Sequence, residues 1–304
     1  MSIVFAGVAT WDTVAQLPHL PDPDGRVVAE AMSAAGGGPA ATAAVTAARL
    51  GLPAALVAAV GADREAGLIT EGLRAEGVDT AELRTVPGAV SGACVVLVDR
   101  GQGSRAICVR PGPTLAIEPD SAAARRIAGA DWLHVDHAGL PAVLPLLAAL
   151  PPASRPKVSY DAGNLTPRRC PAEVDVYVPT MGTLRELYGP DEGLLDAAHR
   201  DGARIVVATD GPNGAVASGP GGVYEVPAHT GIDVRSTLGA GDVFHGALLA
   251  ALAREADLPE ALAYANAAAA LSCRGLDGRS GIPSDDEVRA LAGAVPATRV
   301  KGAP

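Results

Sequence analysis

The chain has little cysteine, and its cysteines lie far apart. Its 304 residues include four, at Cys94, Cys108, Cys170 and Cys273, without a CxxC pair or a Cys/His spacing typical of a zinc site. Neither a disulfide framework nor a structural zinc site is therefore predicted. We expect these side chains to act as small buried hydrophobic groups.

Basic residues are also scarce. The sequence holds 24 Lys and Arg residues against 34 Asp and Glu residues, a formal net charge of −10, and only Lys157 and Lys301 are lysines. Because no Lys/Arg cluster occurs, the sequence argues against nucleic acid or an anionic membrane as the principal partner.

Long apolar runs are missing as well. No run approaches the roughly 20 apolar residues of a membrane-spanning helix, although 48% of the residues are hydrophobic. Residues 1–7 lack the basic start and the long apolar stretch of a signal peptide, and they are typical of a first strand. We therefore expect a cytoplasmic protein with enough hydrophobic residues for a large core.

The chain does contain apolar strands that alternate with helical patterns along most of its length. This alternation predicts a doubly wound α/β fold, with a largely parallel sheet flanked by helices. We expect the core to comprise residues 1–11, 34–89 and 111–295, followed by a frayed tail at 296–304. Strands are expected at residues 3–7, 54–60, 132–136, 158–161, 174–179 and 205–209, and helices at 40–50, 65–76, 138–150, 184–188, 241–254, 259–274 and 285–292.

Residues 12–33 and 90–110 interrupt this alternation. The first segment contains a short strand at 26–31, and the second contains two β-rich runs, at 94–98 and 105–109, that a glycine-containing turn joins. These segments predict a small β-sheet lid that closes over a site and excludes water. Surface hairpins without such a role are the alternative.

The sequence LGAGDV at residues 238–243 places Asp242 in the first turn of a predicted helix, behind three small residues. A helix N-terminus offers free N–H groups and about half a unit of positive charge, so it binds anions. Asp242 could then accept a proton from a hydroxyl that attacks a bound phosphate. An ordinary N-cap is the alternative interpretation.

Two further glycine-containing segments accompany this one. Gly36, Gly37 and Gly38 precede an alanine-rich helix, where glycine lets a bound molecule lie against the backbone. With VGADREAG at residues 60–67 and the GAGD helix start, they resemble the ribokinase-like (PfkB) carbohydrate kinase family. The resemblance extends over about residues 3 to 284, with further matches in the same order at residues 7–12, Leu17-Pro18, 76–79, 158–161 and 207–215.

The resemblance implies transfer of the γ-phosphoryl group of ATP to a hydroxyl of a sugar or a related small molecule. Asp242 matches the family's catalytic base, and the amides of Gly239, Ala240 and Gly241 match its anion hole. Phosphoryl transfer needs in-line positioning and neutralisation of charge, which a helix N-terminus supplies without a cationic side chain. ATP is therefore the expected cofactor, with Mg²⁺ arriving on the nucleotide.

Acceptor binding is assigned to four residues by resemblance. Asp12 matches the family's carboxylate that binds sugar hydroxyls, and a carboxylate can accept two hydrogen bonds from a vicinal diol. Gly37 and Gly38 match glycines that line this pocket, and Thr42 stands where many members have an asparagine. A turn that begins at Asp12 is the alternative for that residue.

Nucleotide binding is assigned by resemblance too. Thr209 and Gly211 match a nucleotide-contacting turn at a strand end, the place where α/β sheets bind ligands. Asn266 resembles the family's adenine-pocket position, although a polar position on a helix surface explains an asparagine equally well. Thr180 begins the segment where many members have an Asn-x-x-Glu motif that organises water around magnesium.

The sequence departs from the family's pattern at three places. Ser236-Thr237 replaces an Asp-Thr pair whose Asp helps to bind potassium, so a K⁺ requirement is doubtful. Thr42 has one donor where asparagine has two, and Thr180 and Thr183 replace the Asn and Glu of the magnesium motif, so the protein ligands of the metal stay unknown. These changes resemble the ketohexokinase and sulfofructose kinase branches, which favours a ketose-like acceptor.

Other functions stay open from the sequence. A nucleoside kinase of the same fold is the nearest alternative, although an aromatic content of 3% offers few rings to stack on a base. A nucleotide-binding homologue without turnover is another, which the intact GAGD segment disfavours. A dinucleotide oxidoreductase is disfavoured because no G-x-G-x-x-G follows the first strand. Lid strands in this family often pair between subunits, so a homodimer through the lid is an option.

Overall fold

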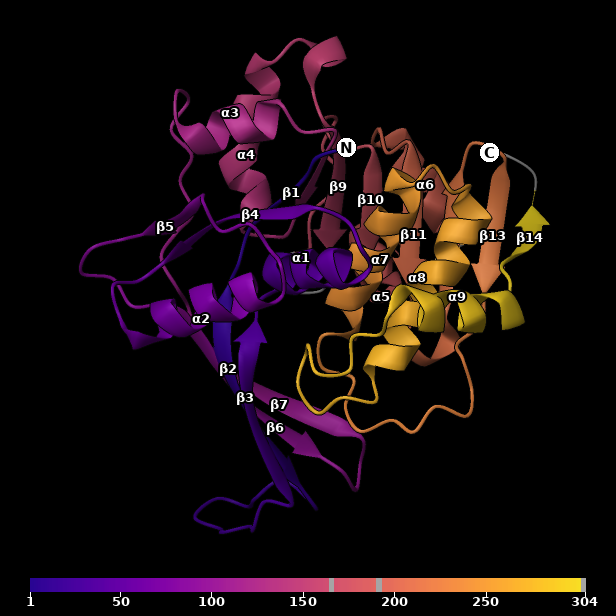
Figure 1. Ribbon diagram of the computed structural model, residues 1–304. Helices are drawn as coiled ribbons and strands as arrows, with labels where there is room; N and C mark the ends of the chain where they lie inside the picture. Colours follow the sequence, from indigo (N-terminus) through magenta and orange to yellow (C-terminus); the bar gives the residue numbers. More distant parts are fainter. Residues whose placement is uncertain (164–166, 190–192, 302–304) are drawn as a thin grey trace.

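Two sheets organise the protein, whose computed structural model describes residues 1–163, 167–189 and 193–301. A ten-stranded sheet lies between two layers of helices, and a four-stranded sheet projects from one end of this body (Figure 1). In spatial order the large sheet contains β5 (Leu83–Thr85), β4 (Ala54–Val60), β1 (Ile3–Ala6), β8 (Trp132–Val135), β9 (Lys157–Ala162), β10 (Val176–Pro179), β11 (Ile205–Thr209), β12 (Ala215–Gly219), β13 (Gly222–Val226) and β14 (Thr298–Lys301).

The strands from β5 to β11 are parallel, and β1, β4, β8, β10 and β11 carry apolar side chains on both faces. In β1, Ile3 and Phe5 pack into one core while Val4 and Ala6 pack into the other, because successive side chains of a strand point to opposite faces. The first core is covered by α1 (Pro39–Arg49), α2 (Arg64–Ala75), α7 (Ala240–Ala253), α8 (Leu258–Ser272) and α9 (Asp285–Ala294), and the second by α3 (Ala122–Ala128), α4 (Gly139–Ala149), α5 (Met181–Tyr188) and α6 (Leu194–Arg200).

This arrangement confirms the predicted doubly wound α/β fold, and each predicted strand and helix of the core has a counterpart within a few residues. In the described ranges, none of the helices is both long enough and apolar enough to cross a bilayer.

The C-terminal segment differs from the expectation. Residues 298–301 form β14, which pairs with β13 and places Arg299 opposite Tyr224. The expectation of a frayed tail is therefore wrong for these residues, because the open edge of β13 offers hydrogen-bond partners that a tail can use. The remainder of that segment, 302–304, lies outside the described residues.

The four-stranded sheet contains β3 (Ala31–Gly37), β2 (Thr10–Leu17), β6 (Gly92–Asp99) and β7 (Ser104–Arg110), in that order. β2 is antiparallel to β3 and parallel to β6. The strand expected at 26–31 is wrong, since β3 begins at Ala31, opposite Gln16. Glu30 still donates its N–H to the carbonyl of Gln16 at 2.8 Å, but the residues before it continue past the end of β2, and Val28 is 84% exposed.

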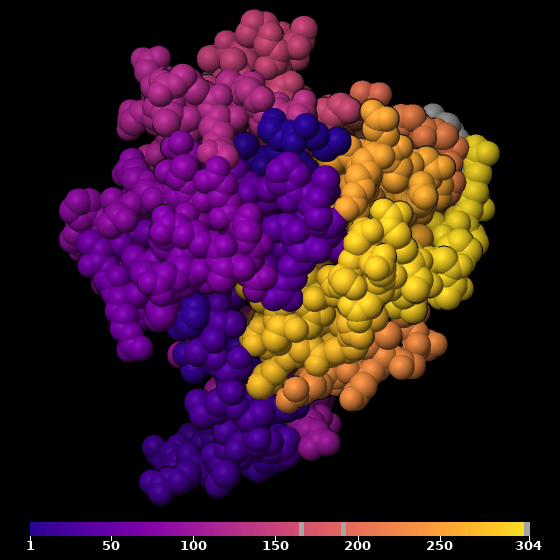
Figure 2. Space-filling model, viewed as in Figure 1, coloured from indigo at the N-terminus to yellow at the C-terminus, as the bar shows by residue number. Residues whose placement is uncertain are grey.

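One face of this small sheet contacts the body next to the start of α7. Val14, Val96 and Val98 pack with Leu238 and Leu276, which lie in the segments before α7 and after α8. Figure 2 shows the sheet projecting below the body beside these C-terminal segments. The sheet is thus placed to cover the turn that contains Asp242.

The cysteines are free thiols with different surroundings. Cys170 and Cys273 are buried as expected, whereas Cys94 is half-buried and Cys108 is exposed. The expectation of burial is therefore wrong for Cys108, because β7 is the edge strand of the small sheet.

Candidate active site

The N-terminus of α7 supplies the first part of the site. Gly239 caps this helix with a φ of +75°, a left-handed conformation that favours glycine. A Cβ on Gly239 would lie 2.7 Å from the Cα of Gly278, so the loop after α8 leaves no room for a side chain. The backbone conformation and the packing therefore both require glycine here.

The first turn of α7 carries backbone donors that the protein does not use. Among the described residues, no acceptor faces the N–H groups of Gly241 and Asp242, and the N–H of Ala240 donates only a long bond of 3.4 Å to the carbonyl of Thr237. A Cβ on Gly241 would meet nothing within 4 Å, so open space lies over the turn. Free N–H groups at the positive end of a helix can bind phosphate oxygens.

Asp242 is half-buried in this turn and is surrounded by other carboxylates. Burial, followed by the negative charge of Asp161, raises the pKa of Asp242 to about 7, and His245 opposes that shift. The negative charges of Asp136 and Asp12 raise the pKa of Asp242 as well, so Asp12 acts on Asp242 despite its distance in sequence. A carboxylate with such a pKa is suited to accept a proton near neutral pH.

The small sheet provides the opposite wall. Asp12 lies on β2, and a Cβ on Gly37 of the adjacent strand β3 would lie 2.0 Å from the Asp12 Oδ2 atom. Glycine at this position therefore leaves room for the carboxylate. The Oδ1 atom of Asp12 is buried and has no hydrogen-bond partner in the part of the chain that the structure describes. Because an unpaired buried acceptor is costly, this atom is a candidate contact for a ligand hydroxyl.

Gly38 and Thr42, at the start of α1, lie beside Gly37. Gly38 caps the helix with a φ of +89°, and a Cβ there would lie 2.5 Å from the carbonyl oxygen of Val8. Thr42 is buried, with 1% of its surface exposed. The structure thus brings the predicted acceptor-binding residues together at one corner of the small sheet.

Arg279 completes this corner and was not predicted from the sequence. It donates from Nη2 to the carbonyl of Gly37 at 3.0 Å and from Nε to the Thr42 hydroxyl at 3.4 Å. The residue is 5% exposed, and burial lowers its pKa to about 10, against the opposing effect of Asp12. Over the described ranges it forms no ion pair with Asp or Glu. A single arginine between glycines has no periodicity, so only the fold could reveal its place.

Asp136 fixes the backbone around the acceptor wall and was likewise not predicted. It follows β8 and is fully buried. Its Oδ2 atom accepts from the N–H groups of Val8 at 2.7 Å and Ala40 at 3.2 Å. Its Oδ1 atom accepts from those of Ala138 at 2.9 Å and Gly139 at 2.8 Å. One carboxylate therefore ties together the end of β1 and the starts of α1 and α4.

The predicted nucleotide residues Thr180 and Thr209 lie side by side at the ends of β10 and β11, joined by an isolated bridge. Gly211 follows with a φ of +52°, and a Cβ there would meet nothing within 4 Å. The Thr180 hydroxyl caps α5 by accepting the N–H of Thr183 at 3.0 Å. These residues occupy the carboxyl ends of parallel strands, where α/β sheets bind ligands.

Asn266 lies in α8 but is 8% exposed, so the alternative of a surface position is wrong. Its Nδ2 atom donates to the carbonyl of Pro227 at 2.9 Å. His229, two residues beyond that carbonyl, has a buried Nε2 atom without a partner in the described structure. An unpaired ring nitrogen here is a second hydrogen-bonding group that the sequence did not reveal.

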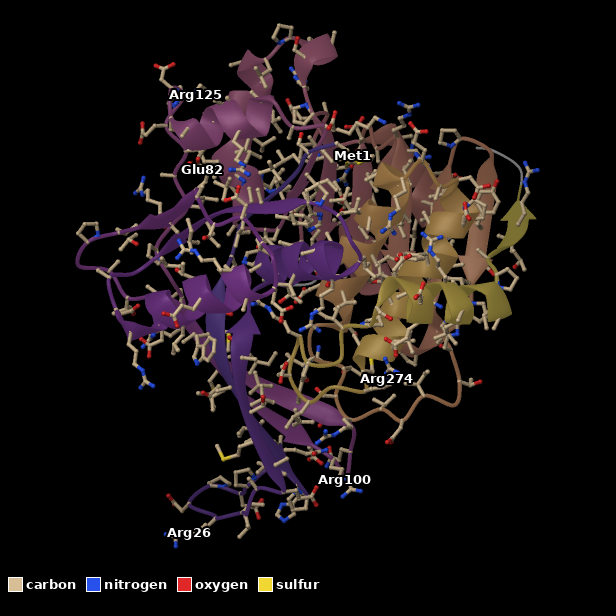
Figure 3. All side chains as sticks on the ribbon, in the orientation of Figure 1. Met1, Arg26, Glu82, Arg100, Arg125 and Arg274 are labelled. Atoms are coloured by element: carbon tan, nitrogen blue, oxygen red, sulfur yellow. The ribbon has the colours of Figure 1, made fainter. Side chains whose placement is uncertain are left out.

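Arginines of the small sheet contact the protein itself. Arg105 on β7 donates from Nη1 to the Thr237 hydroxyl at 2.8 Å, which joins the sheet to the segment before α7. Arg110 donates from Nε and Nη2 to the carbonyl of Ser91, at 3.2 and 3.1 Å. Figure 3 shows that Arg26 lies at the far end of the small sheet, away from the start of α7. Arg100 lines a small pocket together with Arg105, Ser236 and Thr237. Of these arginines, Arg105 comes nearest to the candidate anion site.

A preformed metal cage is not evident. Within the described ranges, no group of three or more His, Cys, Asp and Glu side chains is placed to hold a metal ion. The hydroxyls of Thr180 and Thr183 lie 3.0 Å apart but bond to each other. This donor set fits a magnesium ion that is held mainly by phosphates and water.

Comparisons with known proteins agree with this geometry. The sequence model of the pfkB family of carbohydrate kinases matches residues 3–285. The ATP-dependent ribose-1-phosphate kinase of Halopiger xanaduensis is 31% identical over 295 residues, which cover 95% of this chain and 97% of that protein.

Solved structures share the fold. The ribokinase of Arabidopsis thaliana, complexed with ribose and ATP, matches with a TM-score of 0.81 at 22% identity and covers 96% of this chain and 98% of its own. The nucleoside kinase of Methanocaldococcus jannaschii matches with a TM-score of 0.78 at 16% identity, over 96% and 98% of the two chains. At these identities the likeness establishes the architecture alone.

Proposed function

Because the chain belongs to the pfkB family of carbohydrate kinases, we propose that Asp242 is the base in an ATP-dependent phosphorylation of a small-molecule hydroxyl. The family membership establishes the reaction class, phosphoryl transfer from ATP to a sugar or nucleoside hydroxyl. The observation that carries the residue assignment is the first turn of α7, which combines free N–H groups with a half-buried carboxylate whose pKa is raised by burial and by the charges of nearby carboxylates, Asp12 among them.

In this mechanism the acceptor lies between Asp12 and Asp242. Asp242 takes the proton of the attacking hydroxyl, whose oxygen bonds to the γ-phosphorus of ATP. The bond from that phosphorus to the β,γ-bridging oxygen breaks, and ADP leaves with the electron pair. The N–H groups of Gly239, Ala240 and Gly241 stabilise the charge on the transferred oxygens, because donors fixed in advance need no reorganisation.

Nucleotide binding is assigned to the ends of β10 and β11. Thr180, Thr209 and Gly211 would line the phosphate and ribose side, and Asn266 would lie on the base side with its amide already fixed by Pro227. Magnesium would supply charge neutralisation on the phosphates, with few protein ligands. The Ser236 hydroxyl accepts the N–H of Leu238 at 3.1 Å, so it offers little to a potassium ion. We therefore expect turnover without a specific K⁺ requirement.

For the acceptor, Asp12, Gly37, Gly38 and Thr42 form the polar wall that would bind sugar hydroxyls. Arg279 adds a buried cation without a carboxylate partner in the described chain, and such a group suits an anionic substituent. The Halopiger relative is named for ribose 1-phosphate. A phosphorylated pentose is therefore the first acceptor to test, ahead of the ketose that the sequence favoured.

The test is ADP release measured with ribose 1-phosphate, ribose, fructose, other ketoses and nucleosides as acceptors. We expect the highest kcat/KM with the phosphorylated pentose. Arg279→Met should lower kcat/KM for that acceptor by roughly tenfold or more, the loss of one charge-assisted contact. Arg274→Met is the control, because Arg274 pairs with Glu287 at the surface. Turnover with nucleosides alone would contradict the sugar assignment and favour the nucleoside kinase.

A second copy of the chain is the proposed partner. Apolar side chains are exposed on the small sheet, at Met32 (68%), Val95 (49%), Ile107 (45%) and Val109 (63%). The strand register places Met32 and Val95 on the face opposite to Val14, and Ile107 and Val109 on the same face as Val14. Pairing of two such sheets through the first of these faces would bury Met32 and Val95. Light scattering should then give about twice the chain mass of 30.3 kDa. Val95→Lys should yield monomers, whereas Val28→Lys, in the loop before β3, should not; a monomeric parent protein would contradict this proposal.

A further inference from the structure

A buried ion pair lies about one helical turn after the proposed base Asp242. His245 Nε2 and Asp161 Oδ1 are 3.0 Å apart, and their side chains are only 6% and 12% exposed. His245 follows Asp242 by three positions in α7, so the two side chains lie on one face of the helix. Helical side chains lean toward the N-terminus, which brings the imidazole toward the first turn.

The surroundings make this pair electrically important. Carboxylates from three other parts of the chain raise the pKa of Asp242 by their negative charge. They are Asp161 at the end of β9, Asp136 after β8 and Asp12 on β2. His245 and Arg279 are the cations that interact with Asp242 from α7 and from the loop after α8. A cation at this position offsets part of the effect that the negative charges of these carboxylates have on Asp242.

A second buried histidine, His134, lies beside His245. His134, on β8, has its ring centroid 5.6 Å from that of His245. Burial, aided by the charge of His245, lowers the pKa of His134 to about 3, so it stays neutral. Asp161 raises the pKa of His245 against the effect of burial. The contact with Asp161 therefore favours a proton on His245, whereas the ring of His134 beside it stays neutral.

Stability alone does not explain such a pair. Removing two charges from water is costly, and proteins in which apolar residues replace a buried ion pair are often as stable as the parent. The Nδ1 atom of His245 is also buried without a partner among the described residues. The polar contact that fixes this ring is thus the one to Asp161, which suggests a role other than packing.

We infer that the Asp161–His245 pair is a positioning device for Asp242. The pair holds a cationic imidazole next to the first turn of α7, and this cation determines whether Asp242 is ionised when the acceptor binds. His245 and Asp161 touch neither the acceptor nor the phosphate. They act through Asp242, so this inference rests on the proposed role of that residue. The pair makes Asp242 respond to pH in the neutral range.

The test is the pH profile of kcat/KM in two variants with opposite expected shifts. The parent enzyme should lose activity as pH falls through about 7, since burial and Asp161 raise the pKa of Asp242 to that value and its protonated form cannot accept a proton. His245→Asn removes a cation, so the midpoint should move up by about one pH unit. Asp161→Asn removes the larger negative contribution, so the midpoint should move down. The midpoint of the double variant should lie below that of His245→Asn, near the midpoint of the parent or lower.

Two further measurements keep the outcomes separate. In ¹⁵N spectra of the parent protein at pH 7.5, assigned with His245→Asn, both ring nitrogens of His245 should be protonated and His134 should be neutral. A neutral His245, or variants that lose rate and melting temperature without moving the midpoint, would overturn the inference. If Asp242→Asn loses turnover but the pH midpoints of His245→Asn and Asp161→Asn equal that of the parent, the proposed function survives and this inference fails. If Asp242→Asn keeps normal turnover, both fail.

Discussion

Asp242→Asn is expected to lower kcat by roughly 10²-fold or more while ATP still binds. Asparagine keeps the shape of the side chain at the start of α7 but cannot take a proton from the acceptor hydroxyl. In the proposed site the donors to the phosphates are the backbone N–H groups of Gly239, Ala240 and Gly241, at the start of α7, which the substitution leaves in place. The loss should therefore appear in kcat, with nucleotide affinity changed by no more than a few-fold.

Steady-state ADP release gives kcat, and calorimetry with a non-hydrolysable ATP analogue gives the affinity. Asp257→Asn is the matched control, because Asp257 also begins a helix, where its side chain accepts the N–H of Glu260 at 2.9 Å. That variant should retain its turnover. Near-normal turnover of Asp242→Asn would remove Asp242 from the role of base.

Asp136→Ala should have the largest effect on stability, a loss of about 3 kcal/mol or more in the free energy of unfolding. The substitution leaves four backbone N–H groups, from three segments of the chain, without their acceptor in a fully buried place. Asparagine should not rescue the loss, because its NH₂ group would face two of those donors. The effect should exceed that of any exposed carboxylate.

Urea unfolding followed by circular dichroism measures this change. Asp131→Ala is the control, since Asp131 also accepts a backbone N–H, that of Ser2 at 2.6 Å, but its side chain is 61% exposed. Its variant should unfold at nearly the parent urea concentration. Equal midpoints for Asp136→Ala and the parent would show that water replaces the carboxylate. The Asp136→Ala protein should also bind its acceptor poorly, because Ala40 belongs to the turn that carries Gly38.

The sequence predicted the parts of the structure that depend on local pattern. The strands β1, β4 and β11 are short continuous apolar runs, and the helices α1, α2 and α7 are longer apolar-rich segments with recognisable ends. The glycines at 37, 38 and 239 have conformations or close contacts that exclude a side chain, which is why they were visible as motifs. Asp12 was predicted by resemblance and Asp242 from the GAGD helix start, and in the folded chain the charge of Asp12 acts on Asp242.

The remainder depends on contacts between distant segments. The prediction misplaced β3, because the bounds of that strand depend on where β2 ends. It missed β14, because the pairing of that strand depends on the open edge of β13. Arg279, Asp136 and His245 gain their roles only through partners far away in the sequence. A single titratable side chain has no period, so pattern analysis cannot distinguish it from a surface residue.

The parallel pairing of β2 with β6 also constrains the order of folding. Each of the two hairpins, β2 with β3 and β6 with β7, joins strands close together in the chain. The ladder from Thr10 opposite Gly92 to Leu17 opposite Asp99 joins segments that α1, β4, α2 and β5 separate. Pairing of strands that are far apart in the sequence is slow compared with hairpin formation, because the entropy of closing the long loop is lost before the contacts form. During synthesis, the wall that contains Asp12 should therefore assemble only after the ribosome has released β6, and acceptor binding should be among the last properties that the nascent chain acquires.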